Sequence, residues 1–183
     1  SKERAWRHWK WRKHPVNPCF LSLDILAISK RRGLHLSPKV IRLGGLYRPM
    51  SNPYFNDHYA KNMHRLCGPV FEQGRRGTMG LLRHLKTGGM GVLLFDIYDS
   101  RGTNISFLGK PAPTVTSAAQ IALKTGAVLI PMFGLRRKDC RLFDIILKAP
   151  ITHSTALEMT VQMTKQLEKM VHDDPEQWFW IHR

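Results

Sequence analysis

The stretch TVTSAAQIALKTGAVLIPMF, residues 114–133, decides the fold class. Its first part, Thr114–Lys124, has the apolar spacing of an amphipathic helix, and Gly126 follows as a helix end. Its second part, Ala127–Phe133, is a short continuous apolar run of the kind found in buried strands. A helix that leads directly into a buried strand indicates an α/β or α+β domain.

The alternation of helix and strand continues on both sides of this stretch. Upstream, a helix ended by Gly88-Gly89 precedes a second apolar run that enters Asp96. We therefore expect an α/β fold, a single-domain mixed sheet flanked by helices. The expected strands are 44–47, 90–95, 127–133 and 142–147, and the expected helices are 54–66, 79–86, 114–124 and 157–171.

The N-terminal quarter gives weaker signals. Cys19–Ser29 is mostly apolar and fits a helix or a strand by its period, and we expect a helix. Asn52-Pro53 predicts a helix start, with Asn as the cap and Pro at the first position. We expect residues 74–77 to form a basic loop and residues 96–109 to form a long polar loop. Residues 1–43 are interpreted as a basic N-terminal region and residues 44–183 as the folded domain.

The composition of the 183 residues is strongly basic. Lys and Arg number 29 against 13 Asp and Glu, so the formal net charge is +16. Such a charge favours an anionic partner, whether nucleic acid, anionic lipid or an acidic carrier protein. No apolar stretch approaches the roughly 18 residues of a membrane span. Three Cys without paired spacing argue against a disulfide scaffold or a zinc site.

The first thirteen residues combine charge with aromatic side chains. Trp6, Trp9 and Trp11 lie among six Lys and Arg. This mixture fits the headgroup layer of a membrane, stacking on single-stranded bases, or a solvated basic tail. The residues leave these alternatives open.

Three segments stand out in a chain without a dinucleotide-binding, phosphate-loop, nucleophile-elbow or zinc-helix motif. Arg48 lies at a strand end before a capped helix, and Asp96 lies at the end of a buried strand. The segment 175–183, PEQWFWIHR, combines aromatic residues with a basic end.

In this combination the chain resembles the lipid A biosynthesis acyltransferases, the lauroyl/myristoyl branch of the lysophospholipid acyltransferase superfamily. Four segments carry the resemblance in the order of the family: LYRPMSNPYFNDHY, FDIYDSRGTNISFLGKPAPT, ALKTGAVLIPMFGLRR and PEQWFWIHR. They cover the chain from about Gly44 to Arg183.

The resemblance implies transfer of a fatty acyl chain from acyl carrier protein to a hydroxyl of a lipid A precursor. It implies a peripheral protein on the cytoplasmic face of the bacterial inner membrane, with acyl carrier protein and anionic lipid as partners. We expect a monomer, no nucleic-acid partner, no metal and no cofactor beyond the acyl carrier co-substrate.

The resemblance also suggests site residues. The family motif His-x4-Asp/Glu aligns best with Cys19 and Asp24, so a Cys stands where the family has its basic His. A second register places His14 on the motif without its acid. The expected substrate-binding residues are Arg48, Asn52, Asp96, Gly109, Arg136 and Arg137.

Because the motif His is not matched, a second hypothesis is open: a shortened and catalytically inactive copy that serves as a basic module binding lipid or carrier protein. A thiol, with a pKa of about 8.5, is a poor general base at neutral pH.

Overall fold

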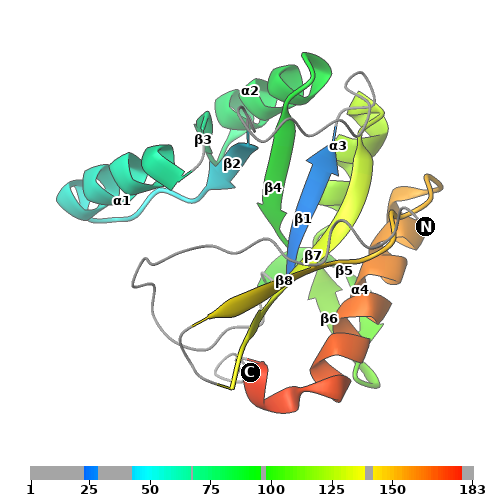
Figure 1. The fold of residues 1–183 in the computed structure, drawn as a ribbon. Helices are drawn as coiled ribbons and strands as arrows, with labels where there is room; N and C mark the ends of the chain where they lie inside the picture. Colours follow the sequence, from blue (N-terminus) through cyan, green and yellow to red (C-terminus); the bar gives the residue numbers. More distant parts are fainter. Residues whose placement is uncertain (1–22, 29–42, 67, 96–97, 139–141, 179–183) are drawn as a thin grey trace, which may run out of the picture. The chain divides into compact units, whose positions relative to one another are not determined.

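The computed structural model describes residues 23–28, 43–66, 68–95, 98–138 and 142–178. Helices and strands alternate along these residues (Figure 1), which confirms the α/β class with a mixed sheet and flanking helices. The chain divides into two compact units. The parallel unit comprises residues 25–93 and 117–129, and the hairpin unit comprises residues 1–24, 94–116 and 130–183.

Parallel strands form the sheet of the parallel unit. Strand β2 (Leu43–Tyr47) lies between β3 (Val70–Glu72) and β4 (Met90–Leu94) and is parallel to both. Strand β1 (Leu23–Ile28) lies on the other side of β4. Parallel neighbours need crossover connections, and helices α1 and α2 supply them between β2, β3 and β4.

Helices α2 (Arg75–Lys86) and α3 (Ser117–Thr125) supply much of the core of this unit, and they are in contact with each other. Leu81 and Leu85 of α2 are buried against Gly91 of β4, where an added Cβ would lie 3.2 Å from Leu81. On α3 the small buried residues Ala118, Ala119 and Ala122 allow close packing. Gly126 directly follows α3, and its φ of +68° is the left-handed conformation that closes many helices.

Helix α1 (Pro53–Leu66) differs from the other helices. The side-chain oxygen of Asn52 accepts hydrogen bonds from the backbone N–H groups of Tyr54 and Phe55, at 3.0 and 3.2 Å. These two bonds confirm Asn52 as the N-cap that the sequence predicts. None of the side chains from Pro53 to Arg65 is buried.

Two antiparallel hairpins belong to the hairpin unit. Strands β5 (Tyr98–Phe107) and β6 (Lys110–Thr114) join through the two residues Leu108 and Gly109. Both residues have positive φ, 49° and 76°, as a two-residue hairpin turn requires. The last residues of β7 (Val128–Arg136) pair with β8 (Phe143–Leu147).

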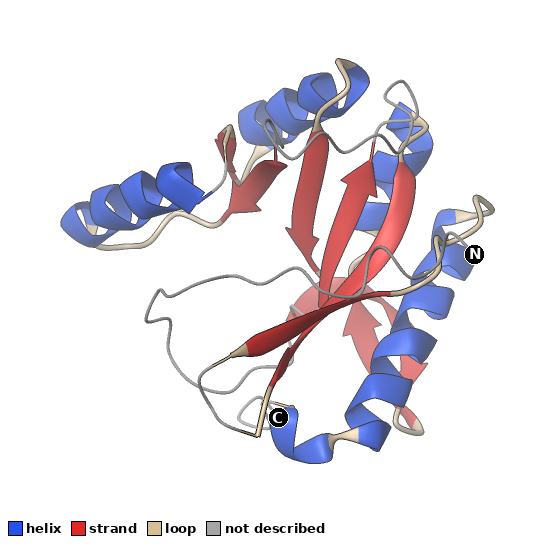
Figure 2. Ribbon diagram, viewed as in Figure 1, coloured by secondary structure: helices blue, strands red, loops and turns tan. Residues whose placement is uncertain are grey.

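Helix α4 (Ala156–Asp173) packs on β5 and leads into the short 3-10 helix η2 (Pro175–Gln177). Thr155 and Glu158 cap α4 reciprocally: each side chain accepts the backbone N–H of the other residue. The buried face of α4 carries Met159, Met163, Leu167 and Val171, at helical spacing. Figure 2 shows this helix and the strands of its unit by type.

Several sequence predictions differ from the structure. Residues 23–28, expected in a helix, form strand β1, because this short and mostly apolar run beside β4 finds its hydrogen-bond partners in the sheet. The expected polar loop after Asp96 is mostly β5, whose Ser, Asn and Thr residues hide the alternation of a strand. Helix α2 begins at Arg75, inside the expected basic loop, and α3 begins at Ser117 because Thr114 is paired in β6. The domain boundary expected between residues 43 and 44 stays a prediction.

Candidate functional site

The end of the β7–β8 hairpin gathers two of the predicted substrate-binding residues. Arg136 is the last residue of β7 and pairs with Phe143, while Leu135 pairs with Asp144. The backbone N–H of Arg137 donates to the carbonyl oxygen of Leu142 at 2.9 Å, which extends the ladder by one residue. The hairpin therefore fixes the backbone of both arginines.

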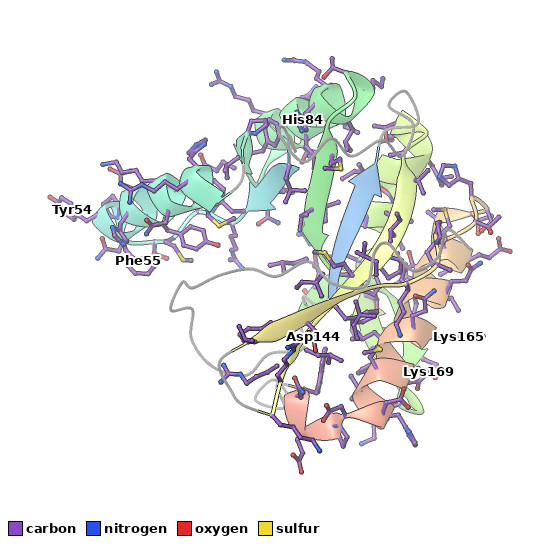
Figure 3. All side chains as sticks on the ribbon, in the orientation of Figure 1. Tyr54, Phe55, His84, Asp144, Lys165 and Lys169 are labelled. Carbon is purple, nitrogen blue, oxygen red and sulfur yellow. The ribbon has the colours of Figure 1, made fainter. Side chains whose placement is uncertain are left out.

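The charge of Arg137 is compensated within the hairpin. Its Nε donates to Oδ1 of Asp144 at 2.7 Å, and its Nη2 reaches the same oxygen. Asp144 lies on β8, as Figure 3 shows. Because a carboxylate already holds this guanidinium, Arg137 has less capacity to bind an anionic ligand.

Arg136 lies in a different environment. Its guanidinium carbon is 5.1 Å from the centre of the Phe143 ring, within the range of a cation–π contact. Its Nε is buried and has no hydrogen-bond partner among the described residues. Within the described part of the chain no carboxylate forms an ion pair with Arg136. The geometry therefore provides a positioned guanidinium whose charge is available to an anionic group.

Gln177 of η2 holds the backbone of Arg136. The N–H of Arg136 donates to Oε1 of Gln177 at 2.7 Å, and Nε2 of Gln177 donates to the Arg136 carbonyl oxygen at 2.9 Å. Nε2 also donates to Oδ2 of Asp174 at 2.9 Å. The segment PEQW is conspicuous in the sequence, but nothing there assigns Gln177 to Arg136, which lies 41 residues earlier.

Gly109 also lies in the hairpin unit, at the tip of the β5–β6 hairpin. Beside it, the N–H of Leu108 donates to Oε1 of Glu168 on α4 at 2.6 Å. The tip is therefore tied to α4, and the φ of +76° gives Gly109 a turn-forming role. Its predicted contact with substrate stays a prediction.

The arginine of β5 provides a contrast to Arg136. Arg101 is exposed and forms an ion pair with Asp99 at 3.3 Å. Hydrogen bonds from the backbone N–H and then the guanidinium of Arg101 lower the pKa of Asp99. This surface pair neutralises its own charge.

Arg48 and Asn52 belong to the parallel unit. Arg48 lies directly after β2 and is exposed, and the side-chain oxygen of Asn52 caps the N-terminus of α1. Asn56 completes the turn, since its Oδ1 accepts the N–H of Met50 at 2.9 Å. The structure gives Asn52 a structural role, and the substrate contacts of both residues stay predictions.

The three other predicted site residues are Cys19, Asp24 and Asp96. Cys19 and Asp96 lie outside the described residues, and of β1, which contains Asp24, only the backbone is described. Among the described residues no three His, Cys, Asp or Glu side chains gather as metal ligands do. In the same part of the chain, no helix is both long and apolar enough to cross a membrane.

Residues 33–183 match the model of the bacterial lipid A biosynthesis acyltransferase family. Over 147 residues the chain is 28% identical to a lipid A biosynthesis lauroyltransferase of Escherichia coli K12, which covers 76% of this chain and 47% of that protein. Over 152 residues it is 24% identical to a lipid A biosynthesis acyltransferase of Haemophilus influenzae, covering 81% of this chain and 48% of that protein. The chain thus spans about half the length of these relatives.

Proposed function

Because this chain belongs to the bacterial lipid A biosynthesis acyltransferase family, we propose that it acts in the transfer of a fatty acyl chain from acyl carrier protein to a hydroxyl of a lipid A precursor. The observation that carries the proposal is the family match over residues 33–183. Those residues include the arginines and the turn glycine that the sequence singles out, namely Arg48, Gly109, Arg136 and Arg137.

The reaction needs a base and a positioned acceptor. A base takes the proton of the acceptor hydroxyl, whose oxygen attacks the thioester carbonyl carbon. The C–S bond then breaks, and the carrier leaves as a thiol after the base has passed the proton to its sulfur. Cys19 and Asp24 remain the proposed pair for this step, and both precede the residues that match the family. A thiol becomes a usable base only where its surroundings lower its pKa.

Arg136 is the proposed contact for an acceptor phosphate. Phe143 and Gln177 hold it in place, and no described carboxylate competes for its charge. Arg137 has its charge compensated by Asp144 and takes the supporting position in the hairpin. Both arginines come from one strand end, and the structure supports Arg136 as the ligand-binding one.

The proposed location is the cytoplasmic face of the bacterial inner membrane, where the protein is peripheral. The formal charge of +16 supports attraction to anionic lipid and to an acidic carrier protein.

A second candidate function rests on one residue. In the register that the sequence favours, Cys19 takes the position of the family His, so a non-catalytic module that binds lipid or carrier protein is the alternative.

Acyl transfer from labelled acyl carrier protein to a lipid A precursor, with purified chain in detergent, tests the two functions. Turnover that disappears in Asp24→Ala supports the enzyme and its register together. A parent without turnover that gains it through Cys19→His identifies a degenerate enzyme. If neither the parent nor any variant shows turnover, although circular dichroism shows each protein to be folded, the result contradicts acyl transfer and favours the binding module.

A further inference from the structure

The turn before α1 and the first residues of this helix present three large apolar side chains to solvent. Tyr54 is 87% exposed, Phe55 55% and Met50 40%. We propose that this group, the α1 tip (Met50, Tyr54 and Phe55), is a docking surface that enters the headgroup layer of an anionic bilayer. The proposal rests on the proposed function for its choice of a bacterial membrane and on the residues of α1 for its location.

The path of the chain makes the α1 tip a projection of the parallel unit. The loop after β2 runs out along α1, and the helix returns toward β3 (Figure 1). Tyr54 and Phe55 lie at the outer end of α1, where the loop from β2 enters the helix (Figure 3). Farther along the helix, the ring of Tyr59 lies 5.8 Å from that of Tyr47 on β2. The helix is thus anchored away from the end that projects.

The backbone at the α1 tip is suited to a less polar surrounding. The first N–H groups of a helix lack partners within the helix and need water or a cap. Here Asn52 accepts the N–H groups of Tyr54 and Phe55 through its side chain, and that of Asn56 through its carbonyl oxygen. The first turn can therefore leave bulk water without exposing unpaired donors.

The charged side chains of α1 and of the turn before it favour an anionic surface. Arg48 precedes the α1 tip by two residues, and Lys61 and Arg65 lie farther along α1, against the single carboxylate of Asp57. All four side chains are exposed. Aromatic residues beside Lys and Arg are typical of segments that lie in the membrane interface.

The size of the patch argues against a protein occupant. Stable protein interfaces bury about 800 Å² on each partner, with some 20–30 residues a side. Three apolar side chains at the tip of one helix fall short of that size. Insertion of a few aromatic side chains into a headgroup layer needs no larger surface.

Co-sedimentation of the whole chain with vesicles tests the proposal. The vesicles contain phosphatidylcholine alone, or phosphatidylcholine with one quarter phosphatidylglycerol. We expect the parent to bind the anionic vesicles, and Tyr54→Ser/Phe55→Ser to bind them roughly tenfold more weakly. The matched control is Leu157→Ser on α4, because Leu157 is a large apolar side chain that is 48% exposed and belongs to the other unit. Its binding should equal that of the parent.

Two results would overturn the proposal. One is equal vesicle binding by the parent and the folded double variant. The other is a parent that forms a dimer on size exclusion at rising concentration while the double variant stays monomeric, because a second copy would then cover the α1 tip.

The acyl-transfer assay in detergent separates this proposal from the proposed function. If the α1 tip only docks on lipid, the double variant retains the detergent-phase turnover of the parent. A parent that has no turnover but binds anionic vesicles through the α1 tip contradicts the proposed function and supports the docking surface.

Discussion

The side-chain amide of Gln177 bonds to both backbone polar atoms of Arg136: its oxygen accepts the N–H at 2.7 Å and its nitrogen donates to the carbonyl at 2.9 Å. A neighbouring strand makes the same pair of bonds, so Gln177 extends the ladder beyond β7 with a side chain. The relationship links the end of the described chain to the strand end that carries the proposed phosphate contact.

Gln177→Leu removes both bonds and leaves two half-buried backbone groups without their partners. We expect the free energy of unfolding to fall by about 1–3 kcal/mol, measured by denaturant titration. The control Gln162→Leu, at an exposed position of α4, should stay within about 0.5 kcal/mol of the parent. An unchanged unfolding midpoint in Gln177→Leu would contradict the clamp.

Gly89 makes room for a buried histidine. The side chain of His84 is 5% exposed, and its Nε2 lies 3.1 Å from the carbonyl oxygen of Met90. Because that carbonyl only accepts, Nε2 carries the proton in this bond. A Cβ on Gly89 would lie 2.2 Å from Nε2, so the ring must move and give up the bond. We expect Gly89→Ala to cost about 1–3 kcal/mol of stability.

Gly134→Ala is the control for this substitution. Its Cβ would meet nothing nearer than Ile145 at 3.9 Å, so the cost in a denaturant titration should be small. Adding His84→Ala to Gly89→Ala should cost less than the sum of the two single changes, because the clash is then gone. Strict additivity would show that the ring is not what Gly89 accommodates.

The capping box of α4 predicts a stability that depends on pH. The backbone N–H of Thr155, followed by the side chains of Ser154 and Thr155, lowers the pKa of Glu158 from its ordinary value of 4.5. A lowered carboxylate pKa stabilises the fold above 4.5, and that contribution is lost as the pH falls through the folded value. Because Glu158 is exposed, the effect on the melting temperature should be small.

Melting temperatures of the parent and Glu158→Gln, taken from neutral pH downward, measure this effect. The melting temperature of the parent should exceed that of the variant at neutral pH, and the two temperatures should become equal below pH 4.5. Thr155→Ala removes the other half of the box and should cost about 1 kcal/mol. A gap between the two proteins that stays constant with pH would place the contribution elsewhere.

The sequence predicted the buried elements better than the exposed ones. Continuous apolar runs located β4 and β7, and helical spacing located α4, because burial selects apolar residues at a fixed period. Strand β5 was missed because polar residues occupy most of its positions. Strand β1 was mistaken for a helix, because a short apolar run acquires its conformation from the neighbouring strand.

The two arginines could be predicted as site residues from the sequence, but the different environments of their side chains could not. Arg136 and Arg137 are adjacent, and a sequence motif does not distinguish between them. Their surroundings come from other elements: Asp144 on the returning strand for Arg137, and Phe143 on that strand with Gln177 of η2 for Arg136. Such pairings depend on the register of β7 with β8 and on the path of η2, which no local pattern encodes.

The two arginines therefore give the last prediction. If Arg136 holds an acceptor phosphate, Arg136→Ala should raise KM for the lipid A precursor about tenfold or more, since a charge-assisted contact is lost. Arg137→Ala breaks its half-exposed bond to Asp144 and should leave that KM within a factor of about two to three. Arg101→Ala, an exposed change on β5, controls for loss of net charge.

Arg136→Lys distinguishes a phosphate contact from a general need for positive charge. Lysine keeps the charge but lacks the planar fork that stacks on Phe143 and binds two phosphate oxygens at once. We expect Arg136→Lys to recover only part of the KM of the parent, with the free energy of unfolding close to the parental value. Full recovery by Lys would reduce Arg136 to a source of electrostatic attraction. An equal rise in KM for Arg136→Ala and Arg137→Ala would show that the pair with Asp144 opens when the acceptor binds, and that the two residues share the phosphate.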